Sequence, residues 1–211
     1  MRIETVYPTT IDGLQLDGDL AIPEHRVAQA VLCHPHPLYG GDRFNGVIER
    51  LFQALPQAGI TTLRFDFRGV NDSQGTHGDG NDERLDVAAG VEVLSAFDDV
   101  TPIWIVGYSF GALVGLDVTH PHVHGWVAIA PPLAMAGTAR LAAGDHRIKH
   151  VIVPLHDQYS PPSASEPIVA DWNNATLHVV ESADHFLAGH FDVVADIAVA
   201  VIEGSPAPAA R

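Results

Sequence analysis

Short apolar runs of strand length alternate with segments of helical spacing along most of the chain, and this alternation constrains the fold more than any other feature. Strands are expected over 3–7, 14–22, 27–33, 60–67, 103–106, 126–130, 151–155 and 176–180, and helices over 44–58, 85–97, 109–117 and 191–202. Apolar strands joined by helical crossovers pair in parallel and are covered on both faces. The sequence therefore predicts an α/β fold with a mostly parallel central sheet and helices on both faces.

The domain organisation follows from the same pattern. The sequence shows neither an internal repeat nor a linker, so residues 1–204 are expected to form a single domain. Residues 205–211, rich in Pro and Ala, are expected to be a disordered tail. The segment 131–150 is too short for a large lid domain.

Charge and cysteine content exclude several classes of protein. The 211 residues carry 26 acidic and 11 basic side chains, a formal charge of −15, so binding to nucleic acid or to an anionic membrane is not expected. The single cysteine, Cys33, rules out an internal disulfide and reads as a buried apolar residue of a strand. Without a signal-peptide core or an apolar run of the roughly 18–20 residues that a membrane span needs, we expect a soluble cytoplasmic protein.

One turn in this pattern has the sequence of a reactive site. The apolar residues 104–106 lead into Gly-Tyr-Ser-Phe-Gly at 107–111, and small apolar residues follow. A G-x-S-x-G sequence between a strand and a helix predicts a sharp turn with Ser109 at its apex. A side chain at Gly107 or Gly111 would collide with the neighbouring strand or helix. The turn also places the serine at a helix N-terminus, whose free N–H groups favour developing negative charge.

A serine hydroxyl attacks a carbonyl when a base takes its proton and a carboxylate orients that base. In this architecture the chain order is serine, then acid, then histidine. Asp157 follows the strand expected over 151–155, and His185 follows the strand expected over 176–180. Both loops begin at the carboxyl ends of their strands, which is the end of the sheet that carries Ser109. The three residues are therefore predicted to form a catalytic triad.

Other residues near these positions fit the roles less well. Asp184 adjoins His185, and sequence neighbours rarely face each other well enough for an Asp–His hydrogen bond; we expect Asp184 to shape the loop. Asp171 lies between a predicted helix and a loop instead of at a strand end. His156 precedes Asp157, which contradicts the expected order of acid and base.

With this serine turn and these acid and histidine segments, the chain resembles the α/β-hydrolase superfamily. More closely, it resembles the small lidless bacterial serine hydrolases with a His-Pro-His-Pro motif, in the dienelactone-hydrolase-like group. The segments that carry the resemblance span almost the whole chain and are LCHPHPLYGGDRFNGV, AGITTLRFDFRGVNDSQG, VGYSFGA, HDQYSPP and ADHF. The resemblance implies that Ser109, Asp157 and His185 are nucleophile, acid and base. Dienelactone hydrolases proper have cysteine at the turn, and Asn71-Asp72 stands where many relatives have glycine and a small residue.

An acyl-transfer site must also stabilise an oxyanion. One donor is expected to be the N–H of Phe110, which follows the serine. The other is expected from the segment His-Pro-His-Pro-Leu that starts at residue 34. Since Pro35 and Pro37 have no N–H, His36 and Leu38 remain, and His36 is favoured by its nearness to the strand end. A merely rigid turn is the alternative interpretation of this segment.

Two groups of histidines could suggest a metal site. One is the pair His34 and His36, and the other is His120, His122 and His124. The second group follows the helix that begins at the serine and so lies at the opposite edge of the sheet. We expect a surface turn there, and neither a metal nor a cofactor.

Two charged residues at a strand end have a structural interpretation. Asp66 and Arg68 are expected to brace loops through salt bridges, with contact to substrate as the alternative for Arg68.

The sequence thus predicts a serine hydrolase that cleaves a carboxylic ester of small molecules with a small or short acyl group through an acyl-enzyme. Amides and thioesters are the less favoured bonds. The alternatives are an acyltransferase with the same covalent step, a non-catalytic binding protein of the same fold, and a peptidase. The sequence does not predict the oligomeric state.

Overall fold

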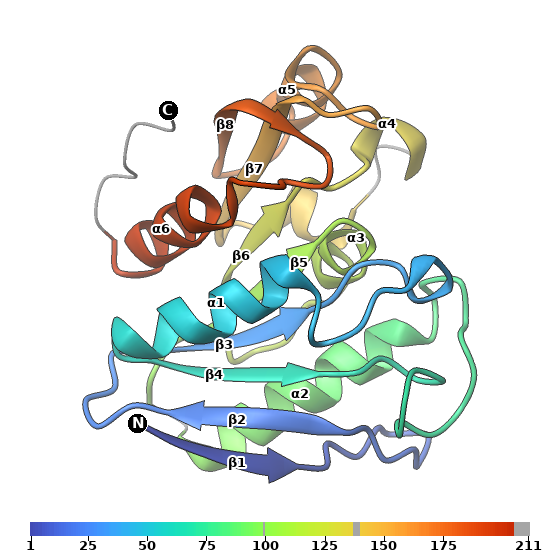
Figure 1. Cartoon of the computed structure of the whole chain (residues 1–211), viewed down its shortest axis with the longest axis vertical. Coiled ribbons are helices and arrows are strands. Elements are labelled where there is room, and N and C mark those ends of the chain that lie inside the picture. The colour runs from blue at the N-terminus through green and yellow to red at the C-terminus, as the bar shows by residue number, and fades with distance from the viewer. Residues whose placement is uncertain (99, 137–139, 205–211) are drawn as a thin grey trace.

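The computed structural model describes residues 1–98, 100–136 and 140–204, in which one eight-stranded sheet runs through the molecule (Figure 1). The strand order is β1-β2-β4-β3-β5-β6-β7-β8. The strands are β1 (Arg2–Val6), β2 (Gly18–Ile22), β3 (Ala28–Cys33), β4 (Ile60–Phe65), β5 (Ile103–Tyr108), β6 (Val123–Ile129), β7 (Ile148–His156) and β8 (Ala175–Asp184). Only β1 with β2 and β2 with β4 pair antiparallel, so the predicted mostly parallel sheet is confirmed.

Helices cover both faces of this sheet, as predicted. They are α1 (Gly46–Gln57), α2 (Glu83–Phe97), α3 (Phe110–Leu116), α4 (Leu133–Ala136), α5 (Pro162–Ala170) and α6 (Phe191–Ile202), with short 3-10 helices η1 (Pro37–Tyr39) and η2 (Leu141–Gly144). The helices α1 and α6 share one face, and α2, α3 and α5 cover the other (Figure 1). Among the described residues, no helix combines the length and apolar character required to cross a membrane. The predicted tail 205–211 lies outside the described residues.

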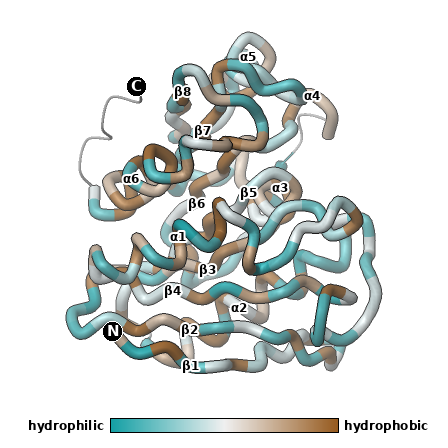
Figure 2. The backbone as a smooth tube through the Cα atoms, viewed as in Figure 1, coloured by the Kyte–Doolittle hydropathy of each residue, from teal (hydrophilic) through white to brown (hydrophobic). Residues whose placement is uncertain are grey.

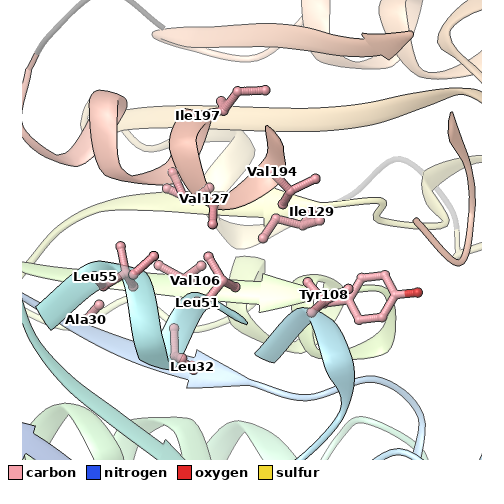
Figure 3. Close-up of a cluster of buried hydrophobic side chains, with 14 of the residues drawn as sticks. Ala30, Leu32, Leu51, Leu55, Val106, Tyr108, Val127, Ile129, Val194 and Ile197 are labelled. Atoms are coloured by element: carbon pink, nitrogen blue, oxygen red, sulfur yellow. The ribbon is translucent and has the colours of Figure 1, made fainter. Parts of the chain in front are cut away.

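The core consists of two apolar layers, one on each face of the sheet. Alternate residues of one strand point to opposite layers: Leu32 of β3 lies beside α1 (Figure 3), whereas Val31 belongs to the layer on the α2 side. The strands β3, β4 and β5 are buried at every position, which fits the apolar run of β5 and the mostly apolar sequence of β3; β4 also buries Thr61, Thr62 and Arg64. Brown, hydrophobic segments of the tube in Figure 2 occur along these inner strands. Burial of each large apolar side chain stabilises the fold by about 1.5–3 kcal/mol.

The predicted helices and strands are present, but several strand bounds differ: β6 and β7 begin three residues before their predicted starts, and β8 extends four residues beyond its predicted end. The last helix has the predicted bounds, and Gly59 follows α1 with a φ of 80°. The strand predicted over 14–22 joins the sheet only from Gly18 onward, and Gln15 forms an isolated bridge with Thr9. Before Gly18, the Leu16 N–H donates to Pro8 and the Asp17 N–H donates to Ser73 Oγ at 2.9 Å, so these residues belong to a loop.

Salt bridges brace the loops at the carboxyl ends of the strands, as predicted for Asp66 and Arg68. The buried Asp66 carboxylate contacts Arg43 Nη1 at 2.5 Å. Arg68 donates to the buried Asp86 at 2.8 Å and to Asp12 at 3.0 Å. Arg68 is 3% exposed and its guanidinium is bonded to these carboxylates, so its contacts are those of a residue that braces the loop.

A pair of histidines lies on the face of the sheet that α6 covers. His150 of β7 and His178 of β8 are 3.0 Å apart from Nδ1 to Nε2, a hydrogen bond that requires at least one neutral ring. Burial and, to a smaller extent, the neighbouring His178 together lower the pKa of His150 to about 4, and burial also lowers the pKa of His178. Protonation of His150 is therefore opposed in the folded protein.

This pair predicts a loss of stability in acid. The unfolded chain binds a proton at His150 near pH 6.5, and the folded protein binds it only near pH 4. The stabilisation is complete above pH 6.5 and is lost as the pH falls toward 4. From pH 7 to pH 5, urea denaturation should show a fall of about 2 kcal/mol from this residue in the free energy of unfolding. His150→Gln should show a smaller fall; equal falls in both proteins would contradict the assignment.

Candidate active site

The tight turn between β5 and α3 positions the serine. Ser109 has φ 53° and ψ −114°, a conformation that costs a non-glycine residue on the order of 1–3 kcal/mol. A Cβ on Gly107 would lie 2.4 Å from the Gly111 carbonyl oxygen, and a Cβ on Gly111 would lie 2.2 Å from the Cys33 carbonyl oxygen. These contacts confirm the steric reason for both glycines. The Ser109 N–H donates to Ile129 at 2.8 Å, which ties the turn to β6.

The structure brings the predicted triad residues together in one hydrogen-bonded chain. Ser109 Oγ lies 2.9 Å from His185 Nε2, and His185 Nδ1 lies 2.8 Å from Asp157 Oδ2. The residues His185 and Asp157 are 5% and 4% exposed, so this hydrogen bond is shielded from water. With the Nδ1 proton donated to the carboxylate, Nε2 is free to accept the serine proton.

The Asp157 carboxylate is held in its ionised form. Burial raises its pKa, but hydrogen bonds from His185 and from the N–H groups of Ser160 and Tyr159 outweigh burial and hold the pKa below its usual value. Oδ1 accepts these two N–H groups at 2.9 and 2.8 Å, which leaves Oδ2 for the imidazole. The acid is therefore oriented by the turn that follows β7.

The competing residues take the structural positions expected of them. Asp184 accepts the Phe186 N–H at 3.0 Å and shapes the loop that carries His185. Asp171 is the exposed C-cap of α5, and His156 is exposed at the end of β7.

Two residues that sequence reasoning missed hold the backbone of His185. The buried Tyr108 hydroxyl, whose ring stands at the end of β5 in Figure 3, donates to the His185 carbonyl at 3.0 Å. The His185 N–H donates to Gln158 Oε1 at 3.0 Å. These residues directly precede the serine and directly follow the acid, and this adjacency is the one signal that the sequence offered.

The turn after β3 brings the oxyanion candidates beside the serine. The His36 ring lies against the Phe110 ring at a tilt of 50°, with centroids 4.7 Å apart. The Leu38 N–H donates to His36 Nδ1 at 3.2 Å, so the 3-10 helix η1 occupies that N–H and Leu38 is the weaker candidate. Within the described structure, the N–H groups of His36 and Phe110 donate to no other residue, so both can bind an anionic oxygen.

A further histidine, His34, braces the turn after β3. His34 is fully buried; its Nδ1–H donates to Pro35 at 2.7 Å and its Nε2 accepts the Phe67 N–H at 3.0 Å. Burial lowers the pKa of His34 to about 4, so the ring is neutral near pH 7. The His36 turn is thereby fixed to the segment after β4.

A second wall of the site comes from the segment before α2, which sequence reasoning did not identify. The fully buried Glu83 accepts the N–H groups of Gly78 and Gly80 at 2.7 and 2.8 Å and lies 2.8 Å from His77 Nδ1. The His77 ring in turn lies 5.0 Å from the His36 ring.

The remaining histidine group lies away from this site. His120 contacts Glu92 at 2.8 Å and stacks on His122 before β6 begins, as expected of a surface turn, whereas the exposed His124 belongs to β6 itself. In the described ranges, no three His, Cys, Asp or Glu side chains form a group able to hold a metal ion.

The turn predicts a sharp contrast between two glycine substitutions. Gly111→Ala forces a Cβ against backbone atoms that cannot move aside and should destabilise the protein by roughly 3 kcal/mol. Gly144→Ala in η2 adds a Cβ with nothing within 4 Å and serves as the matched control. Urea denaturation of both variants checks the contrast, and equal stabilities would show that the turn is not tightly packed.

Comparisons with known proteins identify relatives of this fold. A family model described as serine aminopeptidase, S33, matches residues 31–203. An α/β serine hydrolase homologue from Coxiella burnetii has 28% identity and a TM-score of 0.84, over 93% of this chain and 95% of that one. A serine hydrolase without a lid from Xanthomonas campestris has 27% identity and a TM-score of 0.82, over 99% and 97%.

A curated relative covers less of the molecule. It is an uncharacterized protein from Rickettsia prowazekii, 36% identical over 107 residues. The match spans 49% of this chain and 45% of that protein.

Proposed function

The chain belongs to the serine aminopeptidase S33 family of the α/β-hydrolase superfamily, and from this premise we propose that it is a serine carboxylesterase acting on small esters with a small or short acyl group. The observation that carries the proposal is the hydrogen-bonded chain from Ser109 through His185 to Asp157. An ester is favoured over a peptide bond because, in the residues that the structure describes, the segments after β6 and β7 contain the short helices α4, η2 and α5 and no long helix that would hold an extended substrate.

The geometry suggests the order of proton transfers. Ser109 Oγ attacks the carbonyl carbon while His185 Nε2 takes the hydroxyl proton, and Asp157 stabilises the imidazolium that forms. The carbonyl oxygen becomes negative and accepts the N–H groups of Phe110 and His36. His185 then protonates the leaving alcohol. Water, deprotonated by the same nitrogen, releases the acid and restores the serine.

The strained turn and the dry hydrogen bond support this role. Strain at Ser109 holds the hydroxyl in one direction, so little freedom is lost when it attacks. The fixed N–H groups need no reorganisation as charge develops on the substrate. Both features belong to a site prepared for acyl transfer.

Replacement of the nucleophile tests the proposal. Ser109→Ala should abolish labelling by a fluorophosphonate and lower kcat on ethyl acetate by roughly a thousandfold or more, because it removes the hydroxyl that is hydrogen-bonded to His185 Nε2. Peptide mass spectrometry of labelled wild-type protein should locate the label on Ser109. Ser95→Ala on α2 is the control and should react normally. A folded wild-type protein that neither reacts with the probe nor cleaves the ester would favour a non-catalytic function.

The Tyr108 hydroxyl predicts a separate effect on turnover. Tyr108→Phe leaves the buried His185 carbonyl without its donor, a cost on the order of 1–2 kcal/mol. If the bond positions the base, kcat should fall by about tenfold with little change in KM. Steady-state kinetics alongside thermal unfolding check this outcome, with the exposed Tyr7→Phe as control. A lower melting temperature with unchanged kcat would show that the hydroxyl acts on stability alone.

A further inference from the structure

Two exposed aromatic rings flank the imidazole of the base. The Tyr159 ring lies edge-on to His185 with centroids 4.5 Å apart, and the Phe186 ring lies edge-on at 5.7 Å. The two residues are 42% and 59% exposed, although rings of this size usually lose most of their surface to water on folding. Tyr159 follows β7 and Phe186 follows β8, whose ends are adjacent in the sheet.

The backbone on which these rings stand is fixed. The Tyr159 N–H donates to Asp157 Oδ1 at 2.8 Å, and the Phe186 N–H donates to Asp184 Oδ1 at 3.0 Å. The next residue, Leu187, is completely buried and anchors the loop in the core. The rings are therefore presented to solvent by rigid turns, which lowers the entropy lost when an apolar group binds to them.

Their place beside His185 indicates which part of an ester they contact. For the leaving alcohol to be protonated, its oxygen must come within hydrogen-bond reach of His185 Nε2. The oxyanion lies on the opposite side of the reacting carbon, at the N–H groups of Phe110 and His36. The carbon skeleton of the alcohol must then extend past the edge of the imidazole, where Tyr159 and Phe186 lie.

The charge of the surroundings restricts this alcohol further. The segments 34–41, 130–136, 157–161 and 185–190, which border the serine, contain neither Lys nor Arg. Asp184 adds a carboxylate beside the base. No cation in these segments could compensate an anionic alcohol, so an uncharged group is favoured.

We propose that Tyr159 and Phe186 form a subsite for the alcohol part of the ester, and that this part is an uncharged arylalkyl group. The inference rests on the proposed esterase function and adds the substrate class. The acyl part is small, and selectivity lies in the alcohol. The two rings bind the arylalkyl group by apolar contact and edge-to-face stacking.

A pair of acetates tests the subsite. Phenethyl acetate and ethyl acetate have the same acyl group and alcohols of comparable acidity, so their kcat/KM ratio reports binding of the alcohol. We expect a ratio of at least about tenfold in the wild-type protein and a ratio near one in the double variant Tyr159→Ala/Phe186→Ala. Tyr7→Ala is the matched control: Tyr7 is 61% exposed and lies at the far edge of the sheet, beyond β1, so the ratio should not change.

Each other outcome has a defined meaning. Turnover of both acetates by the wild-type protein with a ratio near one would overturn the subsite and leave the esterase proposal standing. An unchanged ratio in the double variant, with both rates lowered together, would show that the rings have only a structural role and would also overturn it. Failure of the folded wild-type protein to cleave either acetate would overturn both proposals.

Discussion

The close approach of α3 to the end of β3 is the contact on which the rest of the site depends. Gly111 lies so near the carbonyl oxygens of Cys33 and His34 that no side chain fits there, and Gly107 lies equally near Gly111. This contact places the start of α3 beside the turn after β3. It therefore brings the N–H groups of Phe110 and His36 to one side of Ser109, and the conformation of the serine follows from the same turn.

The parallel sheet contributes the other half of the geometry. Because β5, β7 and β8 run in the same direction, the segments after them leave one edge of the sheet, and residues 28 positions apart meet as His185 and Asp157. Buried hydrogen bonds then fix the base from both ends of its backbone, through Tyr108 and Gln158. The geometry of the site thus depends on a rigid backbone as well as on the three side chains.

The fold and the meeting of the triad residues followed from features that are local in sequence. Apolar runs and helical spacing predicted the elements, and the strand-to-helix serine turn predicted where the site lies. The contacts of Glu83 with His77, or of Gln158 with His185, depend on loop conformations and on side chains that meet only after folding. The same limit explains β2: its predicted first residues instead bond to Pro8 and Ser73, which periodicity does not reveal.

A crystal structure of the protein after reaction with a fluorophosphonate tests the central claim most directly. We predict a phosphorus atom bonded to Ser109 Oγ, with a phosphonyl oxygen accepting the N–H groups of Phe110 and His36 at roughly 2.7–3.1 Å. His185 should remain hydrogen-bonded to Asp157. Phosphorus on another residue, or a phosphonyl oxygen that faces solvent instead of these N–H groups, would contradict the account.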